Sequence, residues 1–397
     1  MKQHNILQEI LEAEQKYKNS LILNPTENIP LPLEIPVDFA ENLYTPEEIR
    51  NSENKVIFAG RDALYPFYGE WCELLSAEDA SFKANSGLDA HILLFMSISS
   101  YGDKVLLLSE EAGGHFATLQ ILLRLGLDVK EFIIDSDSLT VDINKTTHLI
   151  NQWKPKFIFV DRSEGLYYED FSWLNKFSFA YKIFDASQYL ANIIASDYLN
   201  PFEMGFDLIL STLHKNYPGP QKAAFFTKEQ NNHYWKKLKK GLATYVSNIH
   251  PKEVYKALST IPDKKYLSFY SKTMLNCTYA LETELQRLNM PVVNRDFSIP
   301  FTQQIWLLYN SKKEAYEFFR TLERINIYTN YRKLPYNLGY GLRLGTAGAV
   351  RQGLREKHCK FLAEIIKESF CNPTDIDVLI KMTKKLLDEI SKEEEYV

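Results

Sequence analysis

The sequence predicts an α/β protein with a mostly parallel central sheet and a second, smaller α/β domain towards its C-terminal end. Between about residues 80 and 228, short apolar runs alternate with longer segments of helical periodicity. This alternation is typical of crossover units, in which helices cover both faces of a parallel sheet. With 397 residues, of which 45% are hydrophobic, the chain is long enough to fold as about two domains.

The apolar runs that we expect to form buried strands are 104–108, 131–135, 157–161, 182–185, 207–213 and 223–227. The last two are joined by a turn-rich segment that is too short for a helical crossover, so this pair is expected to be antiparallel. Beyond residue 258 the pattern predicts a long helix over 266–288, a strand over 303–309, a helix over 312–325, a strand over 340–346 and further helices. We therefore divide the chain into an N-terminal arm (1–45), a large domain (46–258) and a small domain (259–397).

Composition and charge argue against several classes of partner. The formal net charge of −5 provides no general attraction to nucleic acid or to an anionic membrane, and the basic run KKLKKGL (236–242) fits a solvated helix end. No apolar run reaches the ~18 residues of a membrane span. The first twenty residues carry charges throughout, unlike a signal peptide, and the four cysteines show no CxxC spacing. We expect a cytoplasmic protein, and no metal site is expected.

Polar residues follow several of the predicted strands. In sheets of this kind, ligands bind beyond the carboxyl ends of the strands. Three polar clusters lie there: NSGLDA (85–90) before a helix expected over 88–99, Asp185 at the end of KIFD, and His214 with Lys215 after DLILSTL. These clusters are expected to meet in space.

Together the clusters suit a cofactor that carries an aldehyde, a pyridine ring and a phosphate. Lys215 offers an amine for a Schiff base, and Asp185 offers a carboxylate that keeps the ring nitrogen protonated. His115 can stack on the ring, and Ser86 and Gly87 at a helix start can bind the phosphate. Each residue alone has a structural alternative: an ion-paired lysine, a strand-end turn, a packed histidine and a plain N-cap.

The sequences of these segments and their order along the chain resemble serine hydroxymethyltransferase, a pyridoxal-phosphate enzyme of the aspartate-aminotransferase fold. The segments that carry the resemblance, each followed by its counterpart in that family, are LILNPTEN (LIASEN), YPFYGEWCELL (RYYGG-CEYVD), NSGLDA (HSGSQAN), GGHFA (GGHLTHG), FDASQYL (VD-AHIAGL), STLHKNYPGP (TTTHKTLRGP) and YGLRLGTAG (GIRIGTPA). They are scattered over residues 21–350. The resemblance implies a fold-type-I enzyme that binds pyridoxal 5'-phosphate, a small amino-acid substrate and a homodimer with shared active sites.

The resemblance also implies roles for individual residues. Gln188 stands where the family has a histidine near the ring hydroxyl of the cofactor. Arg343 in GLRLGT would clamp the substrate carboxylate, and Thr26 stands where the family has a serine near the same carboxylate. Tyr68 matches a tyrosine of the YYGG motif, and we take it together with His214 as a candidate for proton transfer.

Several departures from the family pattern concern the reaction rather than the cofactor. The family's catalytic glutamate lies in YAEGYPGKRYYGG, whereas this chain reads VIFAGRDALYPFYGE (56–70) and has no glutamate at that place. The arginine of GPRGG has become Gln221, and the GG-P segment that contacts the neighbouring subunit's phosphate reads ATYVSNIHP (243–251). We therefore expect an enzyme that makes or breaks the Cα–Cβ bond of a small β-hydroxy amino acid, an aldolase or transaldolase or a hydroxymethyltransferase-like enzyme. An aldolase or transaldolase that takes a carbonyl compound such as an aldehyde directly, without folate, fits the departures better.

Other readings remain open at this point. The same cofactor supports transamination, decarboxylation and α-methylserine-type transfer, because the reaction depends on which bond of the substrate lies perpendicular to the ring. A non-catalytic pyridoxal-phosphate protein is a further alternative. It fits less well, because a sensor needs no carboxylate clamp such as Arg343.

Overall fold

The computed structural model describes residues 2–31, 48–50, 56–246, 251–261 and 263–396. The described chain forms two compact units. One unit comprises Pro30–Ser268, and the other combines Met1–Ile29 with Phe269–Val397. The predicted boundary between arm and large domain, at residues 45 and 46, falls outside the described residues, and the three-part division stays a prediction.

The unit Pro30–Ser268 is built on a seven-stranded sheet with the strand order β4-β12-β11-β10-β9-β5-β6. Its strands are β4 (Asp79–Ala84), β5 (Lys104–Leu107), β6 (Asp128–Glu131), β9 (Phe157–Asp161), β10 (Tyr181–Asp185), β11 (Leu208–Thr212) and β12 (Ala223–Thr227). Among these described strands, only β12 runs antiparallel to its neighbours, and the remaining pairs are parallel. The predicted α/β class and the predicted antiparallel pair are both confirmed.

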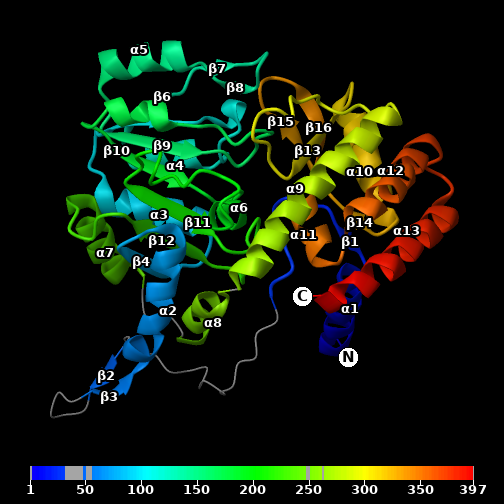
Figure 1. Ribbon diagram of the computed structural model, residues 1–397, viewed down its shortest axis with the longest axis horizontal. Coiled ribbons are helices and arrows are strands. Elements are labelled where there is room, and N and C mark those ends of the chain that lie inside the picture. The colour runs from blue at the N-terminus through cyan, green and yellow to red at the C-terminus, as the bar shows by residue number, and fades with distance from the viewer. Residues whose placement is uncertain (1, 32–47, 51–55, 247–250, 262, 397) are drawn as a thin grey trace. The chain divides into compact units, whose positions relative to one another are not determined.

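Helices cover both faces of this sheet (Figure 1). On one face, α3 (Gly87–Ile98) and α7 (His233–Tyr245) bury an apolar cluster that includes Phe95, Phe159 and Phe225. On the other face, Trp71 of α2 (Gly60–Leu75) packs against Phe82 and Phe226. The central strands β9, β10 and β11 are buried at every residue, as their continuous apolar runs predict.

The prediction for residues 131–135 is wrong. The sheet strand is β6 at Asp128–Glu131, and Ile134–Asp135 forms a short hairpin strand, β7, with β8 (Thr140–Val141). β6 lies at the sheet edge and exposes three of its four residues, so it lacks the apolar run of a buried strand. The sequence prediction also missed β4, whose alternating polar residues hide a strand.

The remaining elements of this unit connect the strands or flank them. They are β2 (Glu48–Arg50), β3 (Val56–Ala59), η1 (Glu110–Ala112), α4 (Thr118–Arg124), α5 (Ile143–Trp153), η2 (Ser172–Lys176), α6 (Leu190–Ile194) and α8 (Pro251–Ser259). Of the segment 243–251 that replaces the family's GG-P sequence, residues 247–250 lie outside the described part of the chain.

The second unit contains a three-stranded antiparallel sheet of order β13-β16-β15. Its elements are α1 (Lys2–Lys18), β1 (Leu21–Ile22), most of α9 (Lys264–Arg287), β13 (Gln304–Leu308), α10 (Lys312–Arg324), β14 (Ile327–Tyr328), β15 (Asn330–Leu334), β16 (Gly339–Gly345), α11 (Thr346–Arg351), α12 (Glu356–Cys371), α13 (Ile376–Ile390) and η3 (Ser391–Tyr396). The N-terminal segment joins this unit because β1 pairs in parallel with β14. The helices and strands predicted beyond residue 258 are confirmed within a few residues.

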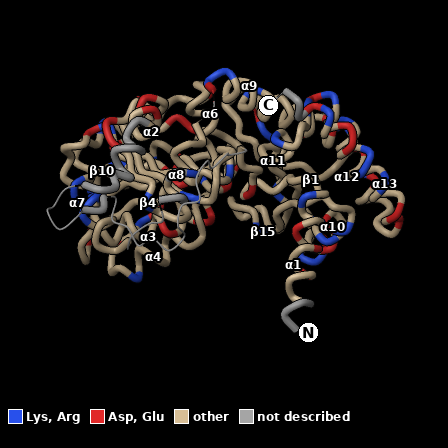
Figure 2. Tube along the Cα trace, turned by 90° about the horizontal axis from the view of Figure 1, so that it is seen from below, with Lys and Arg blue, Asp and Glu red and all other residues tan. Residues whose placement is uncertain are grey.

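The surface carries charges of both signs. Acidic and basic residues are interspersed along α12 and α13 (Figure 2). In the basic run of α7, Lys236 and Lys240 are exposed, and Lys239 Nζ lies 3.2 Å from Asp79 Oδ2. Among the described residues, no helix combines the length and the apolarity needed to cross a membrane.

Candidate active site

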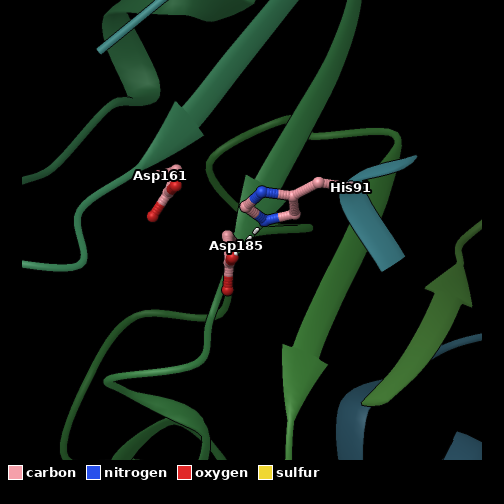
Figure 3. Close-up of side chains that lie close together, drawn as sticks. All are labelled: His91, Asp161 and Asp185. Carbon is pink, nitrogen blue, oxygen red and sulfur yellow. Dashed lines mark hydrogen bonds and ion pairs between the residues drawn. The ribbon is translucent and has the colours of Figure 1, made fainter. Parts of the chain in front are cut away.

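Asp185 ends β10 at the carboxyl edge of the seven-stranded sheet. It is buried, and its carboxylate is held at both oxygens. The Ser187 backbone N–H donates to Oδ1 at 2.8 Å, and His91 Nε2 lies 2.8 Å from Oδ2 (Figure 3). A carboxylate offers about four lone-pair sites, so these two contacts leave room for a further donor such as a protonated ring nitrogen.

His91 comes from the second turn of α3, and sequence reasoning missed it. The residue lies four positions after Gly87, on the same side of the helix, so it approaches the edge where α3 begins. Its ring is 1% exposed, and its second nitrogen, Nδ1, lies 3.0 Å from Thr118 Oγ1. This fixed orientation makes His91 the direct neighbour of the carboxylate predicted to serve the cofactor ring. The helical spacing from Gly87 was the signal that could have found it.

Asp161 is a second buried carboxylate in the same place. It ends β9, and the strand register pairs it with Asp185. Its Oδ2 accepts the backbone N–H of His115 at 3.0 Å, and its Oδ1 accepts the Ser163 hydroxyl at 2.9 Å. Sequence reasoning overlooked Asp161, although FIFVD ends in aspartate just as KIFD does.

A ring nitrogen of His91 and one carboxylate oxygen each of Asp161 and Asp185 all lie within 4.8 Å of one another (Figure 3). Burial and the nearby charge of Asp185 raise the pKa of Asp161 to about 6. Burial also acts to raise the pKa of Asp185, but the hydrogen bond and charge of His91, assisted by the charge of Lys215, outweigh it and hold that pKa below its ordinary value. Asp185 is therefore the carboxylate of this pair that is ionised throughout the neutral range.

A tight turn places His115 against this cluster. Gly113 has a φ of +86°, and a Cβ there would lie 1.9 Å from the Glu164 carbonyl oxygen, so the turn requires glycine. The His115 ring meets His91 edge-on at 5.6 Å and stacks on Phe116 at 4.7 Å. The structure thus brings His115 to the cluster, and its predicted stacking on the cofactor ring stays a prediction.

Lys215 and His214 follow the end of β11, beside β10. The charge of Lys215 acts on Asp185, and the next residue, Asn216, is buried and bonded to Ala191 and Asn192 of α6. Burial and the charge of Lys215 lower the pKa of His214 to about 4, so its imidazole is neutral at pH 7. Two predicted residues, Lys215 and Asp185, therefore lie close enough to interact.

Ser86 and Gly87 begin α3 at the same edge of the sheet. Ser86 is the N-cap, and its hydroxyl oxygen accepts the Asp89 N–H at 3.2 Å, which leaves the hydroxyl proton able to donate elsewhere. A Cβ on Gly87 would lie 2.9 Å from Thr212 Cγ2, so the helix start packs closely against the end of β11. The N-cap alternative and the phosphate role are therefore compatible.

Gln188 and Tyr68 have different surroundings. Gln188 is 2% exposed and follows Ser187, whose hydroxyl accepts the Thr212 N–H at 2.9 Å, so it belongs to the same sheet edge. Tyr68 lies on α2 with its ring edge-on to Phe82 at 5.6 Å. The proton-transfer role of Tyr68 stays a prediction.

The two predicted carboxylate-binding residues, Arg343 and Thr26, belong to the other unit. Arg343 of β16 is 2% exposed. Its Nε–H and Nη2–H groups donate hydrogen bonds to Asn330 Oδ1 on β15, at 3.0 Å and 2.7 Å. Thr26 lies in the loop after β1, and its hydroxyl donates to Asn24 Oδ1 at 2.8 Å. Each is described within its own unit, and their role towards a substrate stays a prediction.

The residues at the sheet edge fit a pyridoxal-phosphate cofactor. Within the described chain, Thr212 Oγ1 and His214 Nδ1 are buried and lack a hydrogen-bond partner. Both belong to the strand end that carries Lys215, and buried polar atoms of this kind normally have a partner. An amine, a carboxylate, a helix N-terminus and these unsatisfied atoms thus converge on one edge.

No family model matches the chain, but individual proteins are similar to it over most of its length. The serine hydroxymethyltransferase of Sulfolobus acidocaldarius is 25% identical over 334 residues, which cover 81% of this chain and 76% of that protein. That of Metallosphaera sedula is 25% identical over 333 residues, with the same two coverages.

Among solved structures, L-threonine transaldolase from Pseudomonas fluorescens superposes with a TM-score of 0.87 at 20% sequence identity. The match covers 97% of this chain and 91% of that one, so the two proteins share their fold over nearly their whole length. The resemblance found in the sequence motifs is confirmed, and the chain is a divergent relative of the serine hydroxymethyltransferases with the fold-type-I architecture.

Proposed function

We propose that this protein is a pyridoxal 5'-phosphate-dependent enzyme that makes or breaks the Cα–Cβ bond of a small β-hydroxy amino acid. The observation that carries the proposal is the placement of Lys215 near Asp185 in a buried polar cluster at the carboxyl edge of the sheet. The names of its relatives, serine hydroxymethyltransferase and L-threonine transaldolase, support this class of substrate.

When bound, pyridoxal 5'-phosphate supplies an electron sink for the electron pair left on the substrate's Cα. Lys215 would hold the cofactor through its amine, and Asp185 would keep a proton on the ring nitrogen. His91 and the Ser187 N–H orient Asp185 by occupying one position on each of its oxygens. Ser86 and Gly87 would hold the phosphate, and His115 and Gln188 would lie against the ring.

Arg343 binds the substrate carboxylate, and Thr26 assists it. Because His214 is neutral at pH 7, it can accept the proton of a β-hydroxyl group, directly or through water, and Tyr68 is the second candidate for this step. A folate-independent aldolase or transaldolase that uses an aldehyde fits the chain best, because the segment VIFAGRDALYPFYGE (56–70) has no glutamate at the place of the family's catalytic glutamate.

We further propose a cytoplasmic homodimer with shared active sites. The resemblance supports the dimer, and so does α1, where Ile6, Leu7, Ile10 and Leu11 are each more than half exposed. The four cysteines are all free thiols, in keeping with a reducing compartment.

The proposal is tested by measuring aldehyde release from threonine and serine, with and without tetrahydrofolate. We expect cleavage without tetrahydrofolate and no acceleration when it is added. Strong stimulation by tetrahydrofolate would instead make the chain a hydroxymethyltransferase proper. Absence of cleavage under both conditions, with pyridoxal phosphate bound, would contradict the reaction type.

A further inference from the structure

Lys222 is a buried lysine at the carboxyl edge of the seven-stranded sheet. It is 2% exposed and directly precedes β12. Its carbonyl oxygen accepts the Leu213 N–H at 2.9 Å, two residues before Lys215. Its Nζ donates to Asn85 Oδ1 at 2.8 Å, next to Ser86. Lys222 thus links the segment after β11, which contains Lys215, to the loop that precedes α3.

The start of α3 already contains a negative charge. Asp89 lies in the first turn, and its Oδ2 accepts the Asn85 N–H at 2.8 Å. A dianionic phosphate bound at this helix start would be repelled by that carboxylate, although the N–H groups and the helix dipole attract it. The ammonium group of Lys222, held on the side chain of Asn85, supplies the opposite charge.

A second observation at this place points to a ligand. Thr212, the last residue of β11, is 1% exposed, and its hydroxyl oxygen is without a hydrogen-bond partner in the described chain. Its methyl group lies 2.9 Å from where a Cβ on Gly87 would be. Buried hydroxyl groups normally have a hydrogen-bond partner, so this hydroxyl near the helix start is available to bind a ligand at the site.

We propose that Lys222 binds the phosphate group of the cofactor, as a charged partner to the helix start at Ser86 and Gly87. This inference rests on the proposed function, because it takes the ligand to be pyridoxal 5'-phosphate. In the family's GPRGG motif a glycine stands at this position, next to the arginine replaced by Gln221, so the positive charge is a feature of this chain.

The test compares two ligands that differ only in the phosphate. Protein freed of its cofactor is titrated with pyridoxal 5'-phosphate and with pyridoxal, and binding is followed by absorbance. Lys222→Met should weaken the affinity for pyridoxal 5'-phosphate about tenfold or more, the scale of a lost charged hydrogen bond, and leave that for pyridoxal unchanged. Lys222→Arg should retain most of the affinity for pyridoxal 5'-phosphate.

Lys182→Met is the matched control, because Lys182 is also a buried lysine, on β10, with its Nζ 3.9 Å from Asp207. It should not change the ratio of the two affinities. If Lys222→Met does not fold, Lys222→Gln keeps a donor for Asn85 and removes only the charge, and the same selective loss is expected.

Equal loss for both ligands, or no loss for either, would overturn the role of Lys222 and leave the proposed function intact. Failure of the unmodified protein to bind either ligand would overturn the proposed function itself.

Discussion

Asp185 and Arg343 are both buried charged residues on strands, and they differ in what sets their charge. Asp185 lies among groups that titrate or carry charge: His91, Asp161 and Lys215. Arg343 is held by a neutral amide, since Asn330 Oδ1 accepts two of its N–H groups. The charge state of the first region depends on its neighbours, whereas a guanidinium stays protonated at any working pH.

Because of this difference, we expect Asp185 and Arg343 to have different roles in the site. Under the proposed function, the cluster around Asp185 would set how the cofactor ring is protonated, so changes there should alter turnover and the cofactor spectrum. Arg343 offers a constant charge of fixed orientation, so changes there should alter substrate binding alone.

Asp185→Asn should lower kcat by about 100-fold or more, on the scale of losing a key electrostatic group in an active site. A neutral amide cannot hold the proton on the ring nitrogen. The cofactor content should change much less, since Lys215 and the phosphate site remain. Steady-state kinetics and absorbance measure both quantities, and near-normal turnover would mean that another acid serves the ring.

Arg343→Ala should raise KM for the amino acid about 10- to 100-fold, the equivalent of a charged hydrogen bond of about 1.5–3 kcal/mol. The absorbance spectrum of the protein without substrate should stay as it is. Arg343→Lys is the control, because it keeps the charge but loses the planar pair of donors, and it should recover only part of the binding. An unchanged KM in Arg343→Ala would place the carboxylate clamp elsewhere.

Asp161→Asn should change how stability depends on pH. The pKa of Asp161 is about 6 in the folded chain, above the value of about 3.9 for an unfolded aspartate. The folded state therefore binds the proton more tightly, and the stability that this provides is complete below about pH 4 and lost as the pH rises through 6.

Chemical unfolding at pH 4, 5, 6 and 7 measures this effect. Relative to Asp161→Asn, the unmodified protein should lose stability between pH 4 and 7. Asp185→Asn is the contrast, because a carboxylate with a lowered pKa gains its stabilisation above the unfolded pKa and holds it as the pH rises. A constant difference between the unmodified protein and Asp161→Asn across this range would show that Asp161 is ionised throughout.

The sequence predicted the buried central strands and the polar site residues at their carboxyl ends. The buried strands β9, β10 and β11 read as continuous apolar runs, and two predicted site residues lie at their carboxyl ends: Asp185 is the last residue of β10, and Lys215 follows β11. β6 was misplaced because an edge strand that is largely exposed has no such run. β4 was missed because polar residues interrupt the apolar pattern of its sequence, DASFKA.

The missed site residues share one property: they depend on tertiary neighbours. His91 looks like an ordinary helix residue until α3 is placed on the sheet, where its ring meets Asp185. Asp161 was visible as a strand-end aspartate, but its closeness to Asp185 follows only from the parallel register of β9 and β10. Lys222 reads as a turn residue in sequence, and only the antiparallel return of β12 brings it to Asn85.

The central claim is that the cofactor is attached to Lys215 at the carboxyl edge of the sheet. Reduction of the purified protein with borohydride, followed by peptide mapping, tests it directly, because the reduced linkage survives proteolysis. We predict a single pyridoxyl label on the peptide that contains Lys215, and its loss in Lys215→Ala. A label on Lys222 or on any other lysine would contradict the assignment of the site.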